Sequence, residues 1–271
     1  MYVNHNVFAQ PVGTTRIWRY MDFTKLIALL ETGSLFFSRT DLLGDKFEGS
    51  FSQYSLMNPS FPGTVTLANG TSTEEMRKAE RRAQFLYTRY TSYVSCWHMG
   101  DHESAAMWEY YASHGGGVAV QSTLDRLKGC LWALEPKDVP IRIGRVSYVD
   151  YDTIPIPEGN IYYPLLHKRR SFEHEKELRA VLSWRSDAFD QKIPGPLVWL
   201  GPIEQLDEIF YKTTQPPGIP VRIDIAGLID RIYVAPQSPS WIGELIRRMP
   251  ARYGLPDIEV HQSSLDDDPL Y

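Results

Sequence analysis

The sequence predicts an α+β fold, with a mixed, mostly antiparallel sheet flanked by helices. Short segments rich in β-branched and aromatic residues are interspersed with segments whose apolar residues recur at helical spacing. No linker divides the chain, which favours one domain over residues 1–271. With 271 residues, 43% of them hydrophobic and 23% charged, the chain has the composition of an ordinary soluble globular protein.

In the first third of the chain, residues 16–21 are predicted to form a strand. Asp22 is a suitable N-cap and Gly33 a suitable C-terminal stop for a helix with an apolar stripe between them. Further signals predict a strand at 34–38, a loop at 41–50, an exposed excursion at 51–72 and a helix from the capping box at 72–75 to about 90.

The middle and end of the chain continue the alternation of strands and helices. The predicted elements are a strand at 93–98, a helix at 103–113, strands at 118–121 and 141–151, and a helix from the cap Thr123 to 131. Gly115–Gly117 ends a helix instead of opening one, so we interpret it as a C-cap and turn and not as a phosphate-binding loop. After a loop at 152–164, residues 185–220 are Pro-rich and irregular, with a helical stretch near 203–211. Strands at 221–225, 232–235 and 258–261 and a helix at 240–252 follow.

The segment 171–182, SFEHEKELRAVL, has the most distinctive charge pattern. As a strand it would place Glu173, Glu175, Glu177 and Arg179 on one face, where closely spaced acids need a compensating cation or substrate. As a helix it would pair Glu175 with Arg179 on a solvated face. The apolar residues 180–184 favour the strand.

Charge and cysteine content limit the classes of function. A net charge of -5 gives no general attraction to nucleic acid, although Lys168-Arg169-Arg170 and the basic residues near 77–82 are candidate local patches. The two cysteines, Cys96 and Cys130, lack metal-site spacing, so we expect no zinc site of the usual thiolate kind. No signal peptide or membrane-spanning stretch is evident, which predicts a cytoplasmic protein without membrane partners. No pattern defines an oligomeric state.

Three places carry candidate chemistry. Arg19 on the first strand is suited to clamp a phosphate or carboxylate, and its alternative is a surface ion pair. The loop Asp45-Lys46-Phe47-Glu48-Gly49 can hold a cation or form a solvated turn. His98 is a candidate general base, and Cys96 on the same strand face a candidate nucleophile, although a buried thiol is the commoner outcome.

Taken together, these segments resemble a bacterial family known as domain of unknown function 2971. The resemblance runs from about 16 to 264. It rests on ordered sequence islands: Trp18-Arg19-Tyr20, Leu35–Ser38, Asp45–Gly49, Ser95–His98, Met107–Ala112, Gly117–Val120, and Lys168 with Phe172–Arg179.

A more distant resemblance is to ADP-ribosyltransferases of the arginine–serine–glutamate type, in which an early strand Arg, a middle strand Ser and a late Glu-x-Glu follow in order. Here Arg19, Ser95 and Glu175-Lys176-Glu177 occur in that order. The resemblance implies a related fold, NAD as substrate, and a transferase or NAD glycohydrolase of a toxin or defence type. It also implies binding of the NAD phosphates by Arg19, support of the nicotinamide-side strand by Ser95, and stabilisation of the ribosyl cation by Glu177.

The remaining roles complete that prediction. Glu175 would orient or deprotonate the acceptor, whose identity the sequence does not define. Tyr20, Trp108 or Tyr111 would stack on nicotinamide. This chain departs from the family where Cys96 and Trp97 follow Ser95, so His98 is the alternative polar residue facing the site.

Two other classes of function compete with the transferase. One is a metal-dependent nuclease, with Lys168 near the phosphate. Its candidate ligands are carboxylates: Asp45, Glu48, Glu103, Glu175 and Glu177. The other is a non-catalytic sensor or binding module in which the aromatic and acidic islands form a partner surface. If Arg19 lay across the molecule from Glu177, the transferase interpretation would lose its basis.

Overall fold

A computed structural model describes residues 1–57, 73–112, 116–131, 139–192, 208, 210 and 215–269. The strands of the described chain are β1 (Arg16–Asp22), β2 (Ser34–Arg39), β3 (Ser92–Met99), β4 (Gly117–Thr123), β5 (Ile141–Arg145), β6 (Ser147–Val149), β7 (His167–Arg169), β8 (Glu177–Ser183), β9 (Gly218–Arg222), β10 (Arg231–Val234) and β11 (Glu259–Gln262). The α-helices are α1 (Phe23–Thr32), α2 (Gln53–Met57), α3 (Thr73–Thr91), α4 (Ala105–Ala112), α5 (Leu124–Cys130), α6 (Asp187–Lys192), α8 (Ile225–Leu228) and α9 (Ser240–Arg252). The 3₁₀ turns of the described residues are η1 (Thr40–Leu42), η3 (Pro164–Leu166), η4 (Arg170–Glu175) and η5 (Ser264–Asp266).

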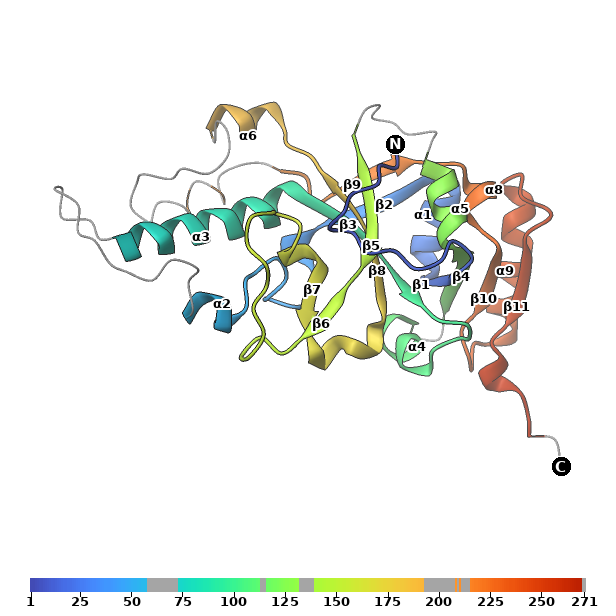
Figure 1. Cartoon of the computed structure of the whole chain (residues 1–271). Helices are drawn as coiled ribbons and strands as arrows, with labels where there is room; N and C mark the ends of the chain where they lie inside the picture. Colours follow the sequence, from blue (N-terminus) through green and yellow to red (C-terminus); the bar gives the residue numbers. More distant parts are fainter. Residues whose placement is uncertain are drawn as a thin grey trace.

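The fold is α+β, as the sequence predicts. The described strands build one sheet of nine, in the order β11-β10-β4-β1-β3-β2-β9, with β8 joining β3 and β5 joining β8. All pairs in this sheet are antiparallel except β10 with β11, and the small sheet of β6 and β7 is parallel. In Figure 1, α3 extends from one end of the sheet, and β10, β11 and α9 lie at the other.

The sheet opens at β3, and this opening places the site. One side of β3 pairs with β8 from Ser92 to His98. The other side is shared, because β1 reaches only His98 and Met99 while β2 reaches only Tyr93 and Val94. The described strands therefore leave 95–97 without a neighbour on that side, and β1 and β2 diverge from each other there.

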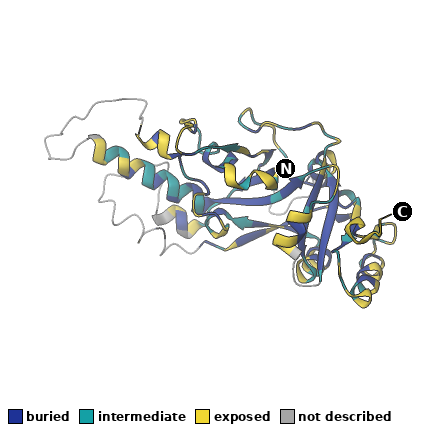
Figure 2. Ribbon diagram, turned by 90° about the horizontal axis from the view of Figure 1, so that it is seen from below, coloured by how far each residue is buried: buried dark blue, intermediate teal, exposed yellow. Residues whose placement is uncertain are grey.

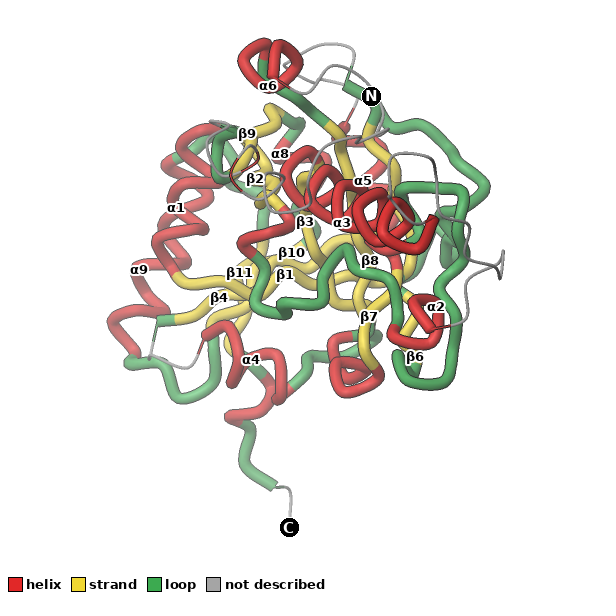
Figure 3. The backbone as a smooth tube through the Cα atoms, turned by 90° about the vertical axis from the view of Figure 1, so that its left-hand side faces the viewer, coloured by secondary structure: helices red, strands yellow, loops and turns green. Residues whose placement is uncertain are grey.

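Helices and loops cover both faces of the sheet. The main core contains buried residues of α1, α5 and α9, such as Leu26, Leu127 and Ile246, against one face. On the opposite face, α4 packs Met107 and Trp108 against Trp18 and Tyr20. Figure 2 shows the strands largely buried and the outer helical faces exposed, and Figure 3 shows α1 and α9 together on one side of the strands. None of the described helices is both long and apolar enough to cross a membrane.

The caps predicted around α1 and α5 are confirmed. The Asp22 side chain accepts from the backbone N–H of Lys25, and Gly33 ends α1 in the left-handed region at φ 59°. The Thr123 side chain likewise accepts from the N–H of Arg126. These local signals hold because each cap satisfies backbone groups that the helix cannot pair internally.

Several predicted boundaries were wrong. The expected strand 141–151 is two strands, β5 and β6, separated at Val146, whose N–H is donated to the Glu177 carbonyl. Strand β9 begins at Gly218, before the expected 221, and α8 already starts at Ile225. The short helix α2 lies within the excursion predicted at 51–72. The capping-box residue Ser72, most of the predicted helix 203–211 and Gly115 of the predicted turn lie outside the described residues. Gly116 lies in a turn, and Gly117 is already the first residue of β4.

Candidate active site

A pocket of about 610 Å³ lies at the opening of the sheet, within the usual size range of small-molecule sites. Its walls come from both sides of the opening, because the pocket passes between β1 and the β2–β3 pair. The polar and aromatic lining residues are Trp18, Arg19, Tyr20, Lys25, Thr32, Ser34, Phe36, Ser38, Asp45, Glu48, Cys96, Trp97, His98, Tyr111, Lys168, Phe172, Glu175, Glu177 and Arg179.

Arg19 reaches across the opening from β1. Its guanidinium donates to Ser95 Oγ at 2.8 Å and to the Phe36 carbonyl at 3.0 Å, and lies 5.8 Å from the Trp97 ring centroid. Burial lowers the pKa of Arg19 to about 10, so it remains charged at neutral pH. Among the described residues no carboxylate forms an ion pair with it. Its positive charge is therefore available to an anionic ligand.

Ser95 and His98 have different places. Ser95 is buried beneath Arg19 and also accepts from the Trp97 indole N–H at 3.2 Å, so it holds the arginine and does not line the pocket. His98 lines the pocket and donates from Nδ1 to the Glu175 carbonyl at 2.7 Å. That bond leaves Nε2 as the unprotonated nitrogen of the neutral ring. Burial lowers the pKa of His98.

Of the three residues predicted to stack on nicotinamide, Tyr20 and Tyr111 line the pocket and Trp108 lies behind Tyr20. The Tyr20 hydroxyl accepts from the backbone N–H of Ser104 at 2.8 Å, and its ring contacts Trp108 edge-on at 4.9 Å between centroids. Trp108 is buried behind Tyr20, bonds Glu103 at 2.9 Å and is absent from the lining. Tyr111 lines the pocket and is 50% exposed, at its rim.

The acidic segment is neither of the two uniform structures considered for it. Residues 170–175 form the 3₁₀ turn η4, and Lys176 adopts a left-handed conformation at φ 39° before β8 begins at Glu177. Glu173 is therefore exposed and does not join the other acids, contrary to the strand prediction. Strand β8 lies inside the sheet, since it pairs with both β3 and β5.

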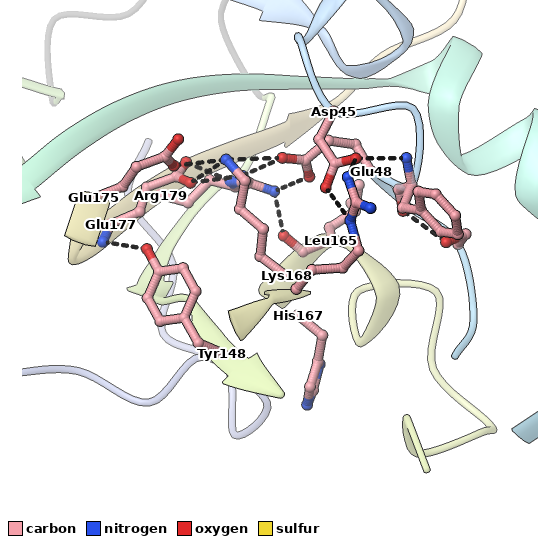
Figure 4. A network of polar contacts seen from close by, with 12 residues as sticks. Asp45, Glu48, Tyr148, Leu165, His167, Lys168, Glu175, Glu177 and Arg179 are labelled. Carbon is pink, nitrogen blue, oxygen red and sulfur yellow. Dashed lines mark hydrogen bonds and ion pairs between the residues drawn. The ribbon is translucent and has the colours of Figure 1, made fainter. Parts of the chain in front are cut away.

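Glu177 and Arg179 share the strand face that points to the pocket. Arg179 is fully buried and forms a two-point ion pair with Glu177, from Nε to Oε1 at 2.7 Å and from Nη2 to Oε2 at 2.8 Å. Arg179 also pairs with Glu48 at 3.0 and 3.2 Å and donates to the Leu165 carbonyl at 2.6 Å. Figure 4 shows Arg179 bonded to both carboxylates. The backbone N–H of Glu177 is donated to the Tyr148 hydroxyl at 2.8 Å.

Lys168 connects the remaining carboxylates of this network. Its Nζ lies 2.6 Å from Glu175 Oε2, 3.3 Å from Glu48 Oε1 and 3.7 Å from Glu177 Oε2. The Phe172 ring, 4.7 Å away, covers the ammonium group. Because Lys168 is 8% exposed, these contacts are made with little water around them.

The pKa values of the two candidate carboxylates, Glu175 and Glu177, are shifted in opposite directions. Burial raises the pKa of Glu175, and Lys168 offsets this only in part. Burial also disfavours ionised Glu177, but Arg179 outweighs that effect and holds its pKa below the usual range. With Glu48, Glu175 and Glu177 ionised against Lys168 and Arg179, the cluster carries one net negative charge toward the pocket.

Cys96 lies on the same face as His98 but is not an activated nucleophile. Burial, together with Glu177, raises its pKa well above the usual value, and the thiol donates to Glu177. It is therefore a neutral donor at physiological pH. Cys96 and Cys130 are both free.

The carboxylates considered for a metal site are paired with cations instead. Asp45 binds Arg169 at 2.7 Å, and its loop brings Glu48 to Arg179. Glu103 lies away from them, accepting from Trp108 and Ser264. Within the described ranges, no three His, Cys, Asp or Glu residues are arranged to hold a metal.

Sequence reasoning missed Tyr148, and it grouped Glu48 and Lys168 with the acidic segment only in the nuclease alternative, as parts of a metal site and not as ion pairs. Residue spacing cannot reveal such pairs, because β6, β7 and the loop after η1 approach β8 only through the tertiary fold. The sequence feature that did indicate nearby cations is the acidic segment itself, because closely spaced buried acids need positive charges beside them. His167, next to Lys168, points away from the network (Figure 4) and donates to the Tyr163 carbonyl at 2.7 Å.

No protein-family model matches the sequence, and no curated protein is significantly similar to it. The resemblance to the domain of unknown function 2971 therefore stays a prediction. Among solved structures, the chain is similar to DarT of Thermus sp. 2.9 in complex with NAD+, at 10% identity and a TM-score of 0.34, over 96% of this chain and 100% of that one. Structures of the same protein with ADP-ribosylated ssDNA and with carba-NAD+ give TM-scores of 0.34 and 0.30, at 10% and 12% identity, over 96% of this chain and 99% and 100% of those. Likeness at this level does not determine the function of this chain.

Proposed function

We propose that the pocket binds NAD and cleaves its nicotinamide–ribose bond, passing ADP-ribose to an acceptor or to water. The observation that carries the proposal is that Arg19 and the carboxylates of Glu175 and Glu177, far apart in sequence, line one pocket. That convergence was the condition the transferase interpretation had to meet. Such an activity fits the toxin or defence role that the sequence resemblance implies.

The charges of the pocket suit two parts of this substrate, the diphosphate and the ribose that carries nicotinamide. Arg19 offers the diphosphate a guanidinium that no carboxylate of the described residues neutralises, with Ser95 and the Phe36 carbonyl holding its orientation. The cluster around Glu177 carries a net negative charge, which stabilises the positive charge that develops on the ribose as nicotinamide leaves. The aromatic rings of Tyr20, Trp97 and Tyr111 offer surfaces for the planar nicotinamide.

The bond changes assign one task to each carboxylate. When the C1′–N bond breaks, its electron pair stays on the pyridine nitrogen and nicotinamide leaves neutral. Glu177, held at both oxygens by Arg179, faces the resulting ribosyl cation as a fixed negative group. The acceptor oxygen or nitrogen then bonds to C1′ and loses its proton to Glu175, or to Nε2 of His98 as the alternative base.

The test is nicotinamide release from NAD, followed by chromatography. Glu177→Gln and Glu175→Gln are each expected to lower the rate by about 10²-fold or more, as for loss of a positioned acid–base or charge-stabilising group. Glu173→Gln is the matched control, since Glu173 is exposed on the same segment and outside the pocket. Release that persists at the wild-type rate in both pocket variants would sink the proposal.

A further inference from the structure

Lys168 contacts three carboxylates of the pocket, those of Glu175, Glu48 and Glu177. It is placed by β7, one residue before Arg169, and its ammonium approaches Glu175, Glu48 and Glu177 at 2.6, 3.3 and 3.7 Å. The ammonium makes its shortest carboxylate contact with Glu175, which comes from a different element, η4. Lys168 itself lines the pocket.

Glu177 does not depend on Lys168 for its orientation. Both of its oxygens accept from Arg179, which is itself fixed by Glu48 and by the Leu165 carbonyl. Glu175 is held differently. Its Oε2 accepts from Lys168, and within the described residues its other oxygen has no hydrogen-bond partner and its side chain is 15% exposed.

We propose that Lys168 is a positioning residue for the acceptor step: its ammonium holds the Glu175 carboxylate at the pocket in the ionised form that can take up a proton. The assignment rests on the proposed function for its catalytic consequence, but the charge state of Glu175 can be measured without any substrate. The two acids are therefore held by different cations, because Lys168 holds Glu175 while Arg179 binds both oxygens of Glu177.

The surroundings of Glu175 leave Lys168 as its nearest cationic partner. The titratable and charged groups facing it from neighbouring elements are Lys168 of β7, Glu177 and Arg179 of β8, Glu48 of the loop after η1, Cys96 and His98 of β3, Tyr111 of α4 and Tyr148 of β6. Lys168 and Arg179 are the cations among them, and the guanidinium of Arg179 is already occupied by Glu177 and Glu48. Burial raises the pKa of Glu175, and Lys168 is the largest opposing influence.

The direct experiment is a carboxyl ¹³C NMR titration of glutamate-labelled protein, with Glu175→Gln used to assign the resonance. In Lys168→Met, the Glu175 carboxyl is expected to titrate at higher pH by about one to three units, the usual effect of losing an opposite charge within hydrogen-bond distance. Lys168→Arg is expected to restore a titration close to that of the wild type. Arg169→Met is the matched control: it removes the same charge at the next position, but its ion pair is with Asp45.

The catalytic readout is the pH profile of nicotinamide release from NAD, with water taking up the ADP-ribose. Because the ionised form of Glu175 is the base, its higher pKa in Lys168→Met shifts the acid limb of the profile to higher pH by the same amount, while Arg169→Met leaves the limb in place. The double variant Lys168→Met/Glu48→Gln removes one charge of each sign. The net charge of the cluster therefore stays at one negative charge, so a titration shift of Glu175 that persists in the double variant is due to the lost contact with Lys168. The double variant also provides the measurement if Lys168→Met does not fold.

The outcomes separate the two claims. If the Glu175 carboxyl titrates as in the wild type in both variants that lack Lys168, the role assigned to Lys168 is overturned, even if the protein cleaves NAD. A protein that releases no nicotinamide at any pH overturns the proposed function, and the NMR arm still decides whether Lys168 holds Glu175 in its ionised form.

Discussion

At the scale of single residues, Arg179 is the group on which the pocket network depends for stability. It is fully buried and satisfies two carboxylates and one carbonyl. Arg179→Met leaves Glu48 and Glu177 buried with too little positive charge, so we expect the free energy of unfolding to fall by about 3–5 kcal/mol. Denaturant unfolding monitored by tryptophan fluorescence measures this. Arg248→Met, which breaks an exposed pair with Glu244, should leave it essentially unchanged. Equal effects of the two changes would show that the buried pair contributes no more than a surface one.

Two histidines, the buried His98 and the half-buried His167, give the free energy of unfolding a defined pH dependence. Burial lowers the pKa of both His98 and His167 below 6.5. The unfolded chain therefore binds more protons than the folded one in the window from the folded values up to about 6.5, so stability rises with pH through that window and is lost as pH falls through it. Unfolding at a series of pH values measures this slope. His167→Gln should reduce it without altering the pocket, since His167 points away from the network. If the substitution leaves the slope unchanged, His167 does not contribute to the pH dependence of stability.

At the scale of elements, local signals predicted what local interactions control. The caps at Asp22, Gly33 and Thr123 placed α1 and α5, because side chain and backbone meet within a few residues. The segment 171–182 failed as a uniform strand, because the η4 turn and left-handed Lys176 redirect the chain so that Glu175 reaches Lys168. That conformation is fixed by contacts with β6 and β7, which no periodicity in the segment encodes.

Strand β5 gives an element-scale prediction at Gly144. The N-terminal segment crosses the strand there, since Arg145 donates its N–H to the Ala9 carbonyl at 2.8 Å. A Cβ at Gly144 would lie 2.9 Å from Phe8 Cα, which is backbone and cannot easily move. Gly144→Ala should therefore lower the free energy of unfolding by about 1–3 kcal/mol. Gly129→Ala in α5, where a Cβ meets nothing within 4 Å, should be neutral or slightly stabilising. Denaturant unfolding of the two variants compares them, and a neutral Gly144→Ala would mean that the crossing segment can shift away.

At the scale of the whole molecule, the opening of the sheet is the feature that joins the candidate residues. The sequence predicted most strands, and it predicted that Arg19 and the late glutamates belong to one site. It could not predict that β1 and β2 share one side of β3, because strand order is decided by packing over the whole chain. Without this opening, Arg19 would be confined to the face opposite Tyr20 and His98.

The opening also predicts where ligand binding should protect the backbone. Gly100 donates its N–H toward β1, and backbone groups alternate along an antiparallel strand, so the N–H of Cys96 points into the opening, where the described strands provide no partner. A ligand spanning the pocket excludes water from this stretch and ties β1 to β3. Saturating NAD should therefore slow amide hydrogen exchange at 18–21 and 95–98, while α9, which contributes no residue to the pocket lining, should be unaffected. Arg19→Met, which removes the cation proposed to hold the diphosphate, should abolish the protection at equal NAD concentration. Uniform slowing throughout the sheet would instead indicate global stabilisation by a ligand bound elsewhere.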